Sequence, residues 1–160
     1  MPRHTAAGLA LAVALVVAVL DQASKAWARI ALHPGHEISV ISGWLWFRLE
    51  RNTGATFGLL SGHNWLFIAF SFVVVLAVVI LVLRRNPVDP LGVGALGAIA
   101  GGGSSNLLDR VRFGGVTDFI EIHLWPTNFN LADAAIRIGV VMFILALLLE
   151  LRRARRPGSI

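Results

Sequence analysis

Cysteine is absent from the 160 residues of this chain. Its absence excludes disulfide scaffolds, thiol nucleophiles, iron–sulfur clusters and cysteine-ligated zinc. Disulfide usage therefore gives no indication of the compartment in which the protein works.

Charged residues are scarce as well. They form 14% of the chain, against 56% hydrophobic residues and a mean hydropathy of +0.74, whereas about 25% of an ordinary soluble domain is charged. This composition argues strongly against a water-soluble globular protein. The length suits one domain, residues 1–160.

Acidic residues are fewer than basic ones: nine Asp and Glu stand against 14 Lys and Arg, which gives a net charge of +5. In a soluble chain such an excess would suggest a nucleic-acid partner. Here the basic residues mostly flank apolar runs, which indicates an orientation signal at a membrane. We expect no nucleic-acid partner.

Four apolar runs organise the sequence. A membrane-spanning helix takes about 20 residues at a rise of about 1.5 Å each, and we predict spans at 6–27, 64–84, 90–108 and 131–150. The fold class is therefore an integral membrane protein, mainly α-helical. In an alternative interpretation, the first run and Ala26-Trp27-Ala28 form a cleavable signal peptide. We prefer a retained span, because the run can continue as a helix to about residue 29.

Basic residues predict the orientation of the four spans. They occur before the first span, between the second and third, and after the fourth, at Arg3, Arg84, Arg85, Arg152, Arg153, Arg155 and Arg156. Four spans place these segments on one side, which the positive-inside rule assigns to the cytoplasm. Both termini are thus expected in the cytoplasm.

Two longer connections, roughly 30–64 and 109–130, fall on the opposite side. Residues 37–50 are rich in β-branched and aromatic side chains around a Ser-Gly turn, which predicts strands. Four tryptophans lie near these boundaries as an aromatic belt would, at Trp44, Trp46, Trp65 and Trp125. We expect a small extracytoplasmic β-sheet, which either covers a site as a lid or anchors in the headgroups.

Four carboxylates lie toward that outer face, at Asp21, Asp109, Asp118 and Asp133. Ionisable groups in a bilayer cost about 2.5–3.5 kcal/mol each at its centre on insertion scales, so those present are usually functional or paired. The sequence therefore predicts a polar site near the outer ends of the spans.

Three of the four have structural explanations. Asp21 and Lys25 are spaced i,i+4, as in a helical ion pair. Asp109 meets the unfavourable end of a helix dipole and precedes an arginine, which favours a structural ion pair. Asp133 fits the third position of a helix whose N-cap is Asn130, in a capping box.

Asp118 lacks such an explanation, since it stands in the apolar stretch 116–122. Two carboxylates in a partly desolvated site can share one proton, so that one activates water while the other polarises a peptide carbonyl. Composition does not select which two of the four would form such a pair.

Five short motifs occur in order along the chain: Asp21-Gln22-Ala-Ser-Lys25, Asn52-Thr-Gly54-Ala55-Thr-Phe57, Asn106-Leu-Leu-Asp109-Arg110-Val111, Gly115-Val116-Thr-Asp118-Phe119 and Phe129-Asn130-Leu-Ala132-Asp133. From about residue 17 to 140, this set resembles that of the bacterial lipoprotein signal peptidases, or type II signal peptidases. The resemblance also covers the number and placement of the spans.

The resemblance implies a single integral-membrane peptidase domain in the bacterial cytoplasmic membrane. Such an aspartyl endopeptidase removes signal peptides from prolipoproteins, cutting before a diacylglyceryl-modified cysteine, with two Asp, an activated water, and neither metal nor cofactor. It assigns catalysis to Asp118 and Asp133. The supporting residues would be Asp21, Lys25, Asn52, Gly54, Asn106, Asp109, Arg110 and Asn130. The expected partners are prolipoproteins and membrane lipid, and the expected state is a monomer.

Two positions depart from the pattern of many family members. Ser105 stands where many have Gly, and Ala134 stands where many have Ser. The second departure removes a hydroxyl beside Asp133 and leaves the hydrogen bonding of that carboxylate in question. Because Asp133 is near a helix start, we assign it the ionised role and Asp118 the proton.

Other classes fit less well. A transporter or channel would spread its acidic groups through the membrane, and a serine protease at Ser104 or Ser105 would lack a histidine base in the apolar runs. The five histidines form no zinc-binding His-Glu-x-x-His motif. A purely structural membrane protein stays possible at this point. The glycines of 92–103 could shape a groove for the signal peptide or serve helix packing.

Overall fold

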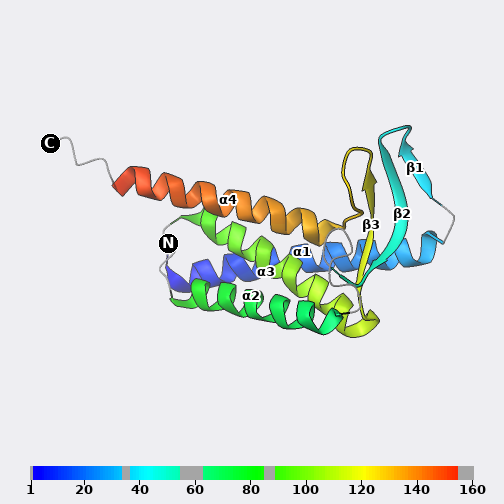
Figure 1. Ribbon diagram of the computed structural model, residues 1–160. Helices are drawn as coiled ribbons and strands as arrows, with labels where there is room; N and C mark the ends of the chain where they lie inside the picture. Colours follow the sequence, from blue (N-terminus) through cyan, green and yellow to red (C-terminus); the bar gives the residue numbers. More distant parts are fainter. Residues whose placement is uncertain (1, 34–36, 55–62, 85–88, 155–160) are drawn as a thin grey trace.

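The computed structural model describes residues 2–33, 37–54, 63–84 and 89–154. Its elements, in order, are α1 (Arg3–Ala31), β1 (Ile38–Ile41), β2 (Leu45–Asn52), α2 (Asn64–Arg84), α3 (Pro90–Phe113), β3 (Val116–Ile122) and α4 (Leu131–Ala154). The four helices lie side by side, with the three strands at one end and both termini at the other (Figure 1).

All four helices are long and apolar enough to cross a membrane. This confirms the predicted fold class of four spans with a small sheet. Three helices extend past the predicted spans, since α1 runs from Arg3 to Ala31, α3 runs on to Phe113 and α4 runs on to Ala154. The end of α3 continues through charged residues that find partners inside the protein, and it stops where Gly114 adopts a left-handed conformation with φ of 71°.

The glycines of α3 let the neighbouring helices approach closely. A Cβ built on Gly97 or Gly101 would lie 2.6 or 2.4 Å from a backbone carbonyl oxygen of α1, and one on Gly102 would lie 2.7 Å from a carbonyl oxygen of α4. In membranes, where apolar burial drives helices together little, such small-residue contacts hold helices in place. For these three glycines the contacts favour the helix-packing interpretation.

The sheet is antiparallel, in the order β1-β2-β3. A tight turn at Gly43, with φ of 76°, joins β1 to β2 as the Ser-Gly signal predicted. Pairing of β2 with β3 places Glu50 opposite Asp118 and Asn52 opposite Val116. The sheet thus carries the Val116–Ile122 segment beside the motif around Asn52.

A small apolar core fixes the sheet to the end of α1. Ala28 and Leu32 of α1 are buried against Phe119 of β3, with Phe47 of β2 packed alongside. The centroid of the Trp27 ring lies 5.4 Å from that of Phe47 and 6.2 Å from that of Phe119. The position of β3 relative to the helices is therefore set by apolar packing, next to the polar site.

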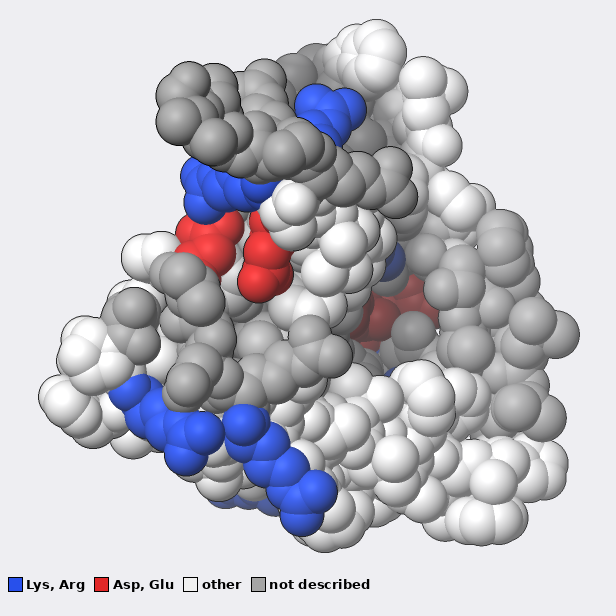
Figure 2. Space-filling model, turned by 90° about the vertical axis from the view of Figure 1, so that its left-hand side faces the viewer, with Lys and Arg blue, Asp and Glu red and all other residues white. Residues whose placement is uncertain are grey.

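The two ends of the molecule differ in composition. The tryptophans Trp27, Trp44, Trp46, Trp65 and Trp125 all belong to the sheet end. The opposite end, seen in Figure 2, carries patches of Lys and Arg, and the helix ends there hold Arg3, Arg84, Arg152 and Arg153. Arg85, Arg155 and Arg156 lie outside the described residues.

Candidate active site

The structure brings Asp118 of β3 and Asp133 of α4 to one site through a shared asparagine. The Asn130 side-chain amide donates to Asp118 Oδ1 at 2.6 Å, and its Oδ1 accepts from the Asp133 backbone N–H at 2.9 Å. Asn130 is fully buried. One buried side chain therefore joins the Asp118 carboxylate to the backbone of Asp133.

The second oxygen of Asp118 is held from β2. Asn52 Nδ2 donates to Asp118 Oδ2 at 3.0 Å, while Asn52 Oδ1 accepts from the Gly54 N–H at 3.0 Å. The local turn thus orients the Asn52 amide toward the carboxylate. The rest of this motif, Ala55, Thr56 and Phe57, lies outside the described residues.

Burial is the main influence on the Asp118 carboxyl. It raises the pKa of Asp118 to about 7, and the negative charge of Asp133 acts in the same direction. Hydrogen bonds from Asn52 and Asn130, and the charge of Lys25, oppose this rise in pKa. Asp118 is therefore able to hold a proton near neutral pH.

Asp133 occupies the first turn of α4, as predicted. Its Oδ1 accepts from Asn106 Nδ2 at 2.8 Å. Its backbone N–H donates to Asn130 Oδ1 at 2.9 Å, as expected for Asn130 as the N-cap of α4. The Asp133 carboxylate thus has a hydrogen-bond donor although Ala134 offers no hydroxyl.

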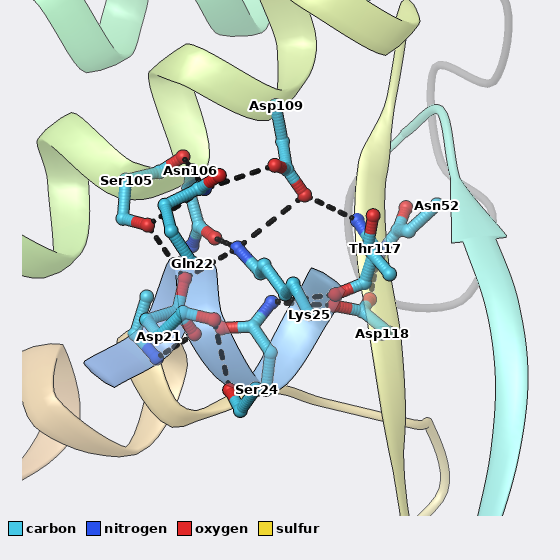
Figure 3. A network of polar contacts seen from close by, with 12 residues as sticks. Asp21, Gln22, Ser24, Lys25, Asn52, Ser105, Asn106, Asp109, Thr117 and Asp118 are labelled. Atoms are coloured by element: carbon cyan, nitrogen blue, oxygen red, sulfur yellow. Dashed lines mark hydrogen bonds and ion pairs between the residues drawn. The ribbon is translucent and has the colours of Figure 1, made fainter. Parts of the chain in front are cut away.

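Lys25 occupies the centre of the surrounding network (Figure 3). Its ammonium lies 2.7 Å from Asp21 Oδ2, 3.5 Å from Asp109 Oδ2 and 2.7 Å from Asn106 Oδ1. Lys25 and both carboxylates are completely buried. This confirms the predicted Asp21–Lys25 pair, and it connects Lys25 to Asp133 through Asn106.

Asp21 also connects α1 to the other two helices of the site. Its Oδ1 accepts from the Ala132 N–H at the start of α4 at 2.7 Å, and its Oδ2 accepts from the Ser105 hydroxyl at 2.6 Å. Gln22 Nε2 donates to Ser105 Oγ and Asp109 Oδ1, both at 3.0 Å. Sequence reasoning missed the roles of Gln22 and Ser105, although Gln22 stands inside a quoted motif.

The structural ion pair expected for Asp109 exists, but the adjacent arginine is not its partner. Asp109 lies 3.5 Å from Lys25 and 3.8 Å from Arg29, and it accepts from the Thr117 N–H at 2.9 Å. Consecutive helical residues do not face each other. Arg110 therefore points elsewhere.

The Arg110 guanidinium turns toward the motif of β2 and the start of α2. It donates to the Gly54 carbonyl and to Asn64 Oδ1, each at 3.2 Å, and lies 4.7 Å from the Phe67 ring centroid. Its positive charge also interacts with both Asp118 and Asp133. Arg110 is thus placed to stabilise negative charge at the carboxylate pair.

All ten residues named from the sequence lie in this one connected site. In the described residues there is no group of three His, Cys, Asp or Glu side chains suited to a metal ion. What the arrangement offers is a pair of carboxylates, one buried and one partly buried, that accept hydrogen bonds from asparagine amides, with the cations Lys25 and Arg110 nearby. Such a pair is able to activate water and polarise a carbonyl.

Comparisons with known proteins agree with the motifs. A family model described as signal peptidase (SPase) II matches residues 13–149. A lipoprotein signal peptidase of Syntrophomonas wolfei is 41% identical over 142 residues, covering 89% of this chain and 94% of that protein. One from Moorella thermoacetica is 39% identical over 141 residues, covering 87% and 92%.

Two solved structures, each described as a bacterial membrane enzyme, have a similar fold. One has a TM-score of 0.87 at 28% identity and covers 96% of this chain and 94% of its own. The other has a TM-score of 0.80 at 30% identity and covers 88% and 93%.

Replacing the buried cation tests the network. Lys25→Met leaves Asp21 and Asp109 buried without their main counter-charge, and we expect it to lower the free energy of unfolding by about 3–5 kcal/mol. SDS titration in mixed micelles measures this loss. Arg48→Met is the control, because Arg48 pairs with Glu37 and Glu121 at the exposed sheet surface and should matter little. Equal unfolding of Lys25→Met and the parent would contradict the central role of Lys25.

Proposed function

The chain belongs to the signal peptidase II family, and on this premise we propose that Asp118 and Asp133 are its catalytic pair. It is an aspartic-type membrane endopeptidase that removes signal peptides from prolipoproteins. The observation that carries the assignment is the shared amide of Asn130, which bonds to the Asp118 carboxylate and to the backbone N–H of Asp133 and so joins the two residues directly.

The two carboxyls have different environments, which suits a division of roles. Asp133 accepts a hydrogen bond from Asn106 and lies in the first turn of α4, where the helix dipole favours a negative charge. Asp118 is buried with a raised pKa and carries the proton. Because two interacting carboxyls titrate as a pair, this assignment describes the dominant protonation state of the pair.

The reaction follows from this state. Asp133 takes a proton from water as the water oxygen bonds to the scissile carbonyl carbon, and Asp118 gives its proton to the carbonyl oxygen. In the tetrahedral intermediate, the proton on Asp133 passes to the amide nitrogen and the C–N bond breaks. The carbonyl re-forms and returns its proton to Asp118, so the pair is restored.

The substrate is cut, we infer, immediately before a diacylglyceryl-modified cysteine. Supporting this, Asp118 and Asp133 lie at the sheet end of the four apolar helices, one in β3 and one in the first turn of α4. A peptide bond at that level reaches the pair while attached acyl chains stay in the bilayer. A single chain supplies every residue of the pair and its supports, which suits a monomer.

We also infer that both termini face the cytoplasm and that the pair lies near the outer face. The Arg residues at the helix ends opposite the sheet support this orientation under the positive-inside rule. The tryptophans at the sheet end suit a membrane–water interface.

Replacement of either carboxylate should abolish cleavage. Asp118→Asn and Asp133→Asn keep the side-chain size but remove the acid and the base, and we expect activity to fall by at least about 10³-fold. The measurement is conversion of a lipid-modified prolipoprotein in cells lacking their own enzyme, seen as a gel shift with the variant present in the membrane.

Asp89→Asn is the matched control for this experiment. Asp89 caps α3 at the far end of the molecule, and asparagine caps equally well, so cleavage should continue. Normal cleavage by Asp118→Asn or Asp133→Asn would remove that residue from the catalytic pair.

The pH profile should show an alkaline limb with its midpoint near pH 7. Asp118 must be protonated to act, so the fraction competent falls as pH rises through its pKa of about 7, and kcat/KM declines about tenfold per pH unit above it. Asn52→Ala removes a hydrogen bond that lowers the Asp118 pKa, which should move the limb to higher pH.

Asn128→Ala is the control for the pH experiment, since Asn128 bonds to the exposed strand β2 at the Arg48 carbonyl and should leave the limb in place. A profile that stays flat from pH 6 to about 9, where the Asp118 carboxyl would be mostly ionised, is incompatible with Asp118 as the proton carrier.

The absence of cysteine permits a direct test of orientation. Ser42 is exposed in the β1–β2 turn, and Ala154 is exposed at the end of α4. The variants Ser42→Cys and Ala154→Cys therefore each place one reactive thiol at one end of the molecule. In spheroplasts with an intact cytoplasmic membrane, a maleimide that cannot cross the membrane should label only the Ser42→Cys variant. After lysis, both should react. The reverse pattern in spheroplasts would invert the proposed topology.

A further inference from the structure

A further pocket lies on the other side of β3 from Asp118. Its volume is about 290 Å³, and its lining includes Arg29, Leu49, Arg51, Phe113 and Thr117. Successive side chains of a strand point to opposite faces, so Thr117 faces this pocket while Asp118 faces Asp133. The pocket adjoins the polar network through Arg29 and Thr117, which both contact Asp109, but it does not include Asp118 or Asp133.

Three arginines surround the corner where α3 turns into β3. The guanidiniums of Arg29 and Arg112 lie 4.5 and 5.5 Å from the centroid of the Phe113 ring. A Cβ on Gly114 would lie 2.8 Å from an Arg51 nitrogen, so the missing side chain leaves room for that guanidinium. Arg29 and Arg51 thus line the pocket together with the Phe113 ring, and Arg112 lies beside that ring outside the pocket lining.

Arg29 is oriented by the protein rather than by solvent. It donates to the Thr117 hydroxyl at 2.9 Å and lies 3.8 Å from Asp109. Its side chain keeps 28% of its surface exposed, so further hydrogen-bond donors remain available to a ligand. Asp109 itself is also shared with Lys25.

Arg51 and Arg112 have no carboxylate partner among the described residues. All nine Asp and Glu of the sequence are among the described residues, and none of them lies within 4.0 Å of the Arg51 or Arg112 guanidinium. Glu50 lies at the pocket as well but forms no ion pair with them. Positive charge therefore exceeds negative charge in this pocket.

The pocket lies at the depth of lipid headgroups. Arg3 and Arg29 are separated by 26 residues of the same helix, or about 39 Å at a rise of about 1.5 Å. A bilayer measures about 40–45 Å including its headgroup regions. Helix α1 therefore places Arg29 at one headgroup layer when Arg3 lies at the other.

We propose that this pocket binds the phosphodiester group of an anionic membrane phospholipid. Planar guanidiniums match phosphate oxygens in a bidentate arrangement, and Leu49 and Phe113 supply apolar walls for the glycerol and the first methylenes. The proposal does not depend on the catalytic assignment, because the two sites use different faces of β3.

Native mass spectrometry of the full chain in detergent micelles tests the proposal. The probes are phosphatidylglycerol and diacylglycerol with the same acyl chains. We expect the parent to retain phosphatidylglycerol and not diacylglycerol, and Arg51→Gln, which removes a charge that lines the pocket, to weaken phosphatidylglycerol binding about fivefold. Arg48→Gln removes the same charge from the same strand outside the pocket, and it should bind like the parent.

Three outcomes would overturn the proposal. Equal weakening by Arg48→Gln would indicate diffuse charge attraction, and equal retention of diacylglycerol would indicate acyl-chain binding alone. Displacement of phosphatidylglycerol by an equal concentration of inorganic phosphate would indicate a site for free phosphate. Circular dichroism establishes that each variant keeps its helices.

Discussion

The buried ammonium of Lys25 is the contact on which the rest of the site depends. A charge in this environment is tolerated only with partners, and Lys25 has three, from two helices. The partners bond onward to two further elements: Asp21 and Asn106 to Ala132 and Asp133 of α4, and Asp109 to Thr117 of β3. One cation thus links α1, α3, β3 and α4 at the point where Asp118 and Asp133 meet. Apolar packing alone, which is weakly directional between helices in lipid, would not define that geometry.

The two carboxyls of the pair differ because of the elements that carry them. Asp133 begins a helix, whose free N–H groups and dipole favour an anion. Asp118 lies in a buried strand, where its hydrogen bonds come from two side-chain amides and burial dominates its pKa. Asn130 belongs to both environments, as N-cap of α4 and as donor to Asp118. The asymmetry needed for acid and base roles therefore arises from ordinary secondary structure.

Features governed by local rules could be predicted from the sequence. Span number, the hairpin turn, the i,i+4 pair of α1 and the Asn130 cap all depend on residues a few positions apart. The partner of Asp109 could not be predicted, because Lys25, Arg29 and Gln22 lie more than 75 residues away in the sequence and local spacing suggested its neighbour instead. The same holds for Ser105, whose bonds to Asp21 and Gln22 need the packed helices. Choosing two of four carboxylates required the resemblance of motifs, since composition and periodicity treat all four alike.

The positions of the charged residues in the fold explain how one chain carries both an orientation signal and a polar site. Among the described residues, the helix ends away from the sheet hold four basic residues, Arg3, Arg84, Arg152 and Arg153, and two acids, Asp89 and Glu150. The sheet end holds seven basic and seven acidic residues. The excess of positive charge among the described residues therefore belongs to the terminal end. At the sheet end, ion pairs join Lys25, Arg29 and Arg48 to carboxylates. The Arg110 charge acts on the proposed catalytic pair, and Arg137 lies over the rings of Trp125 and Phe129. Arg51 and Arg112 have no carboxylate partner in the described residues, so their charge is available to the phospholipid proposed above.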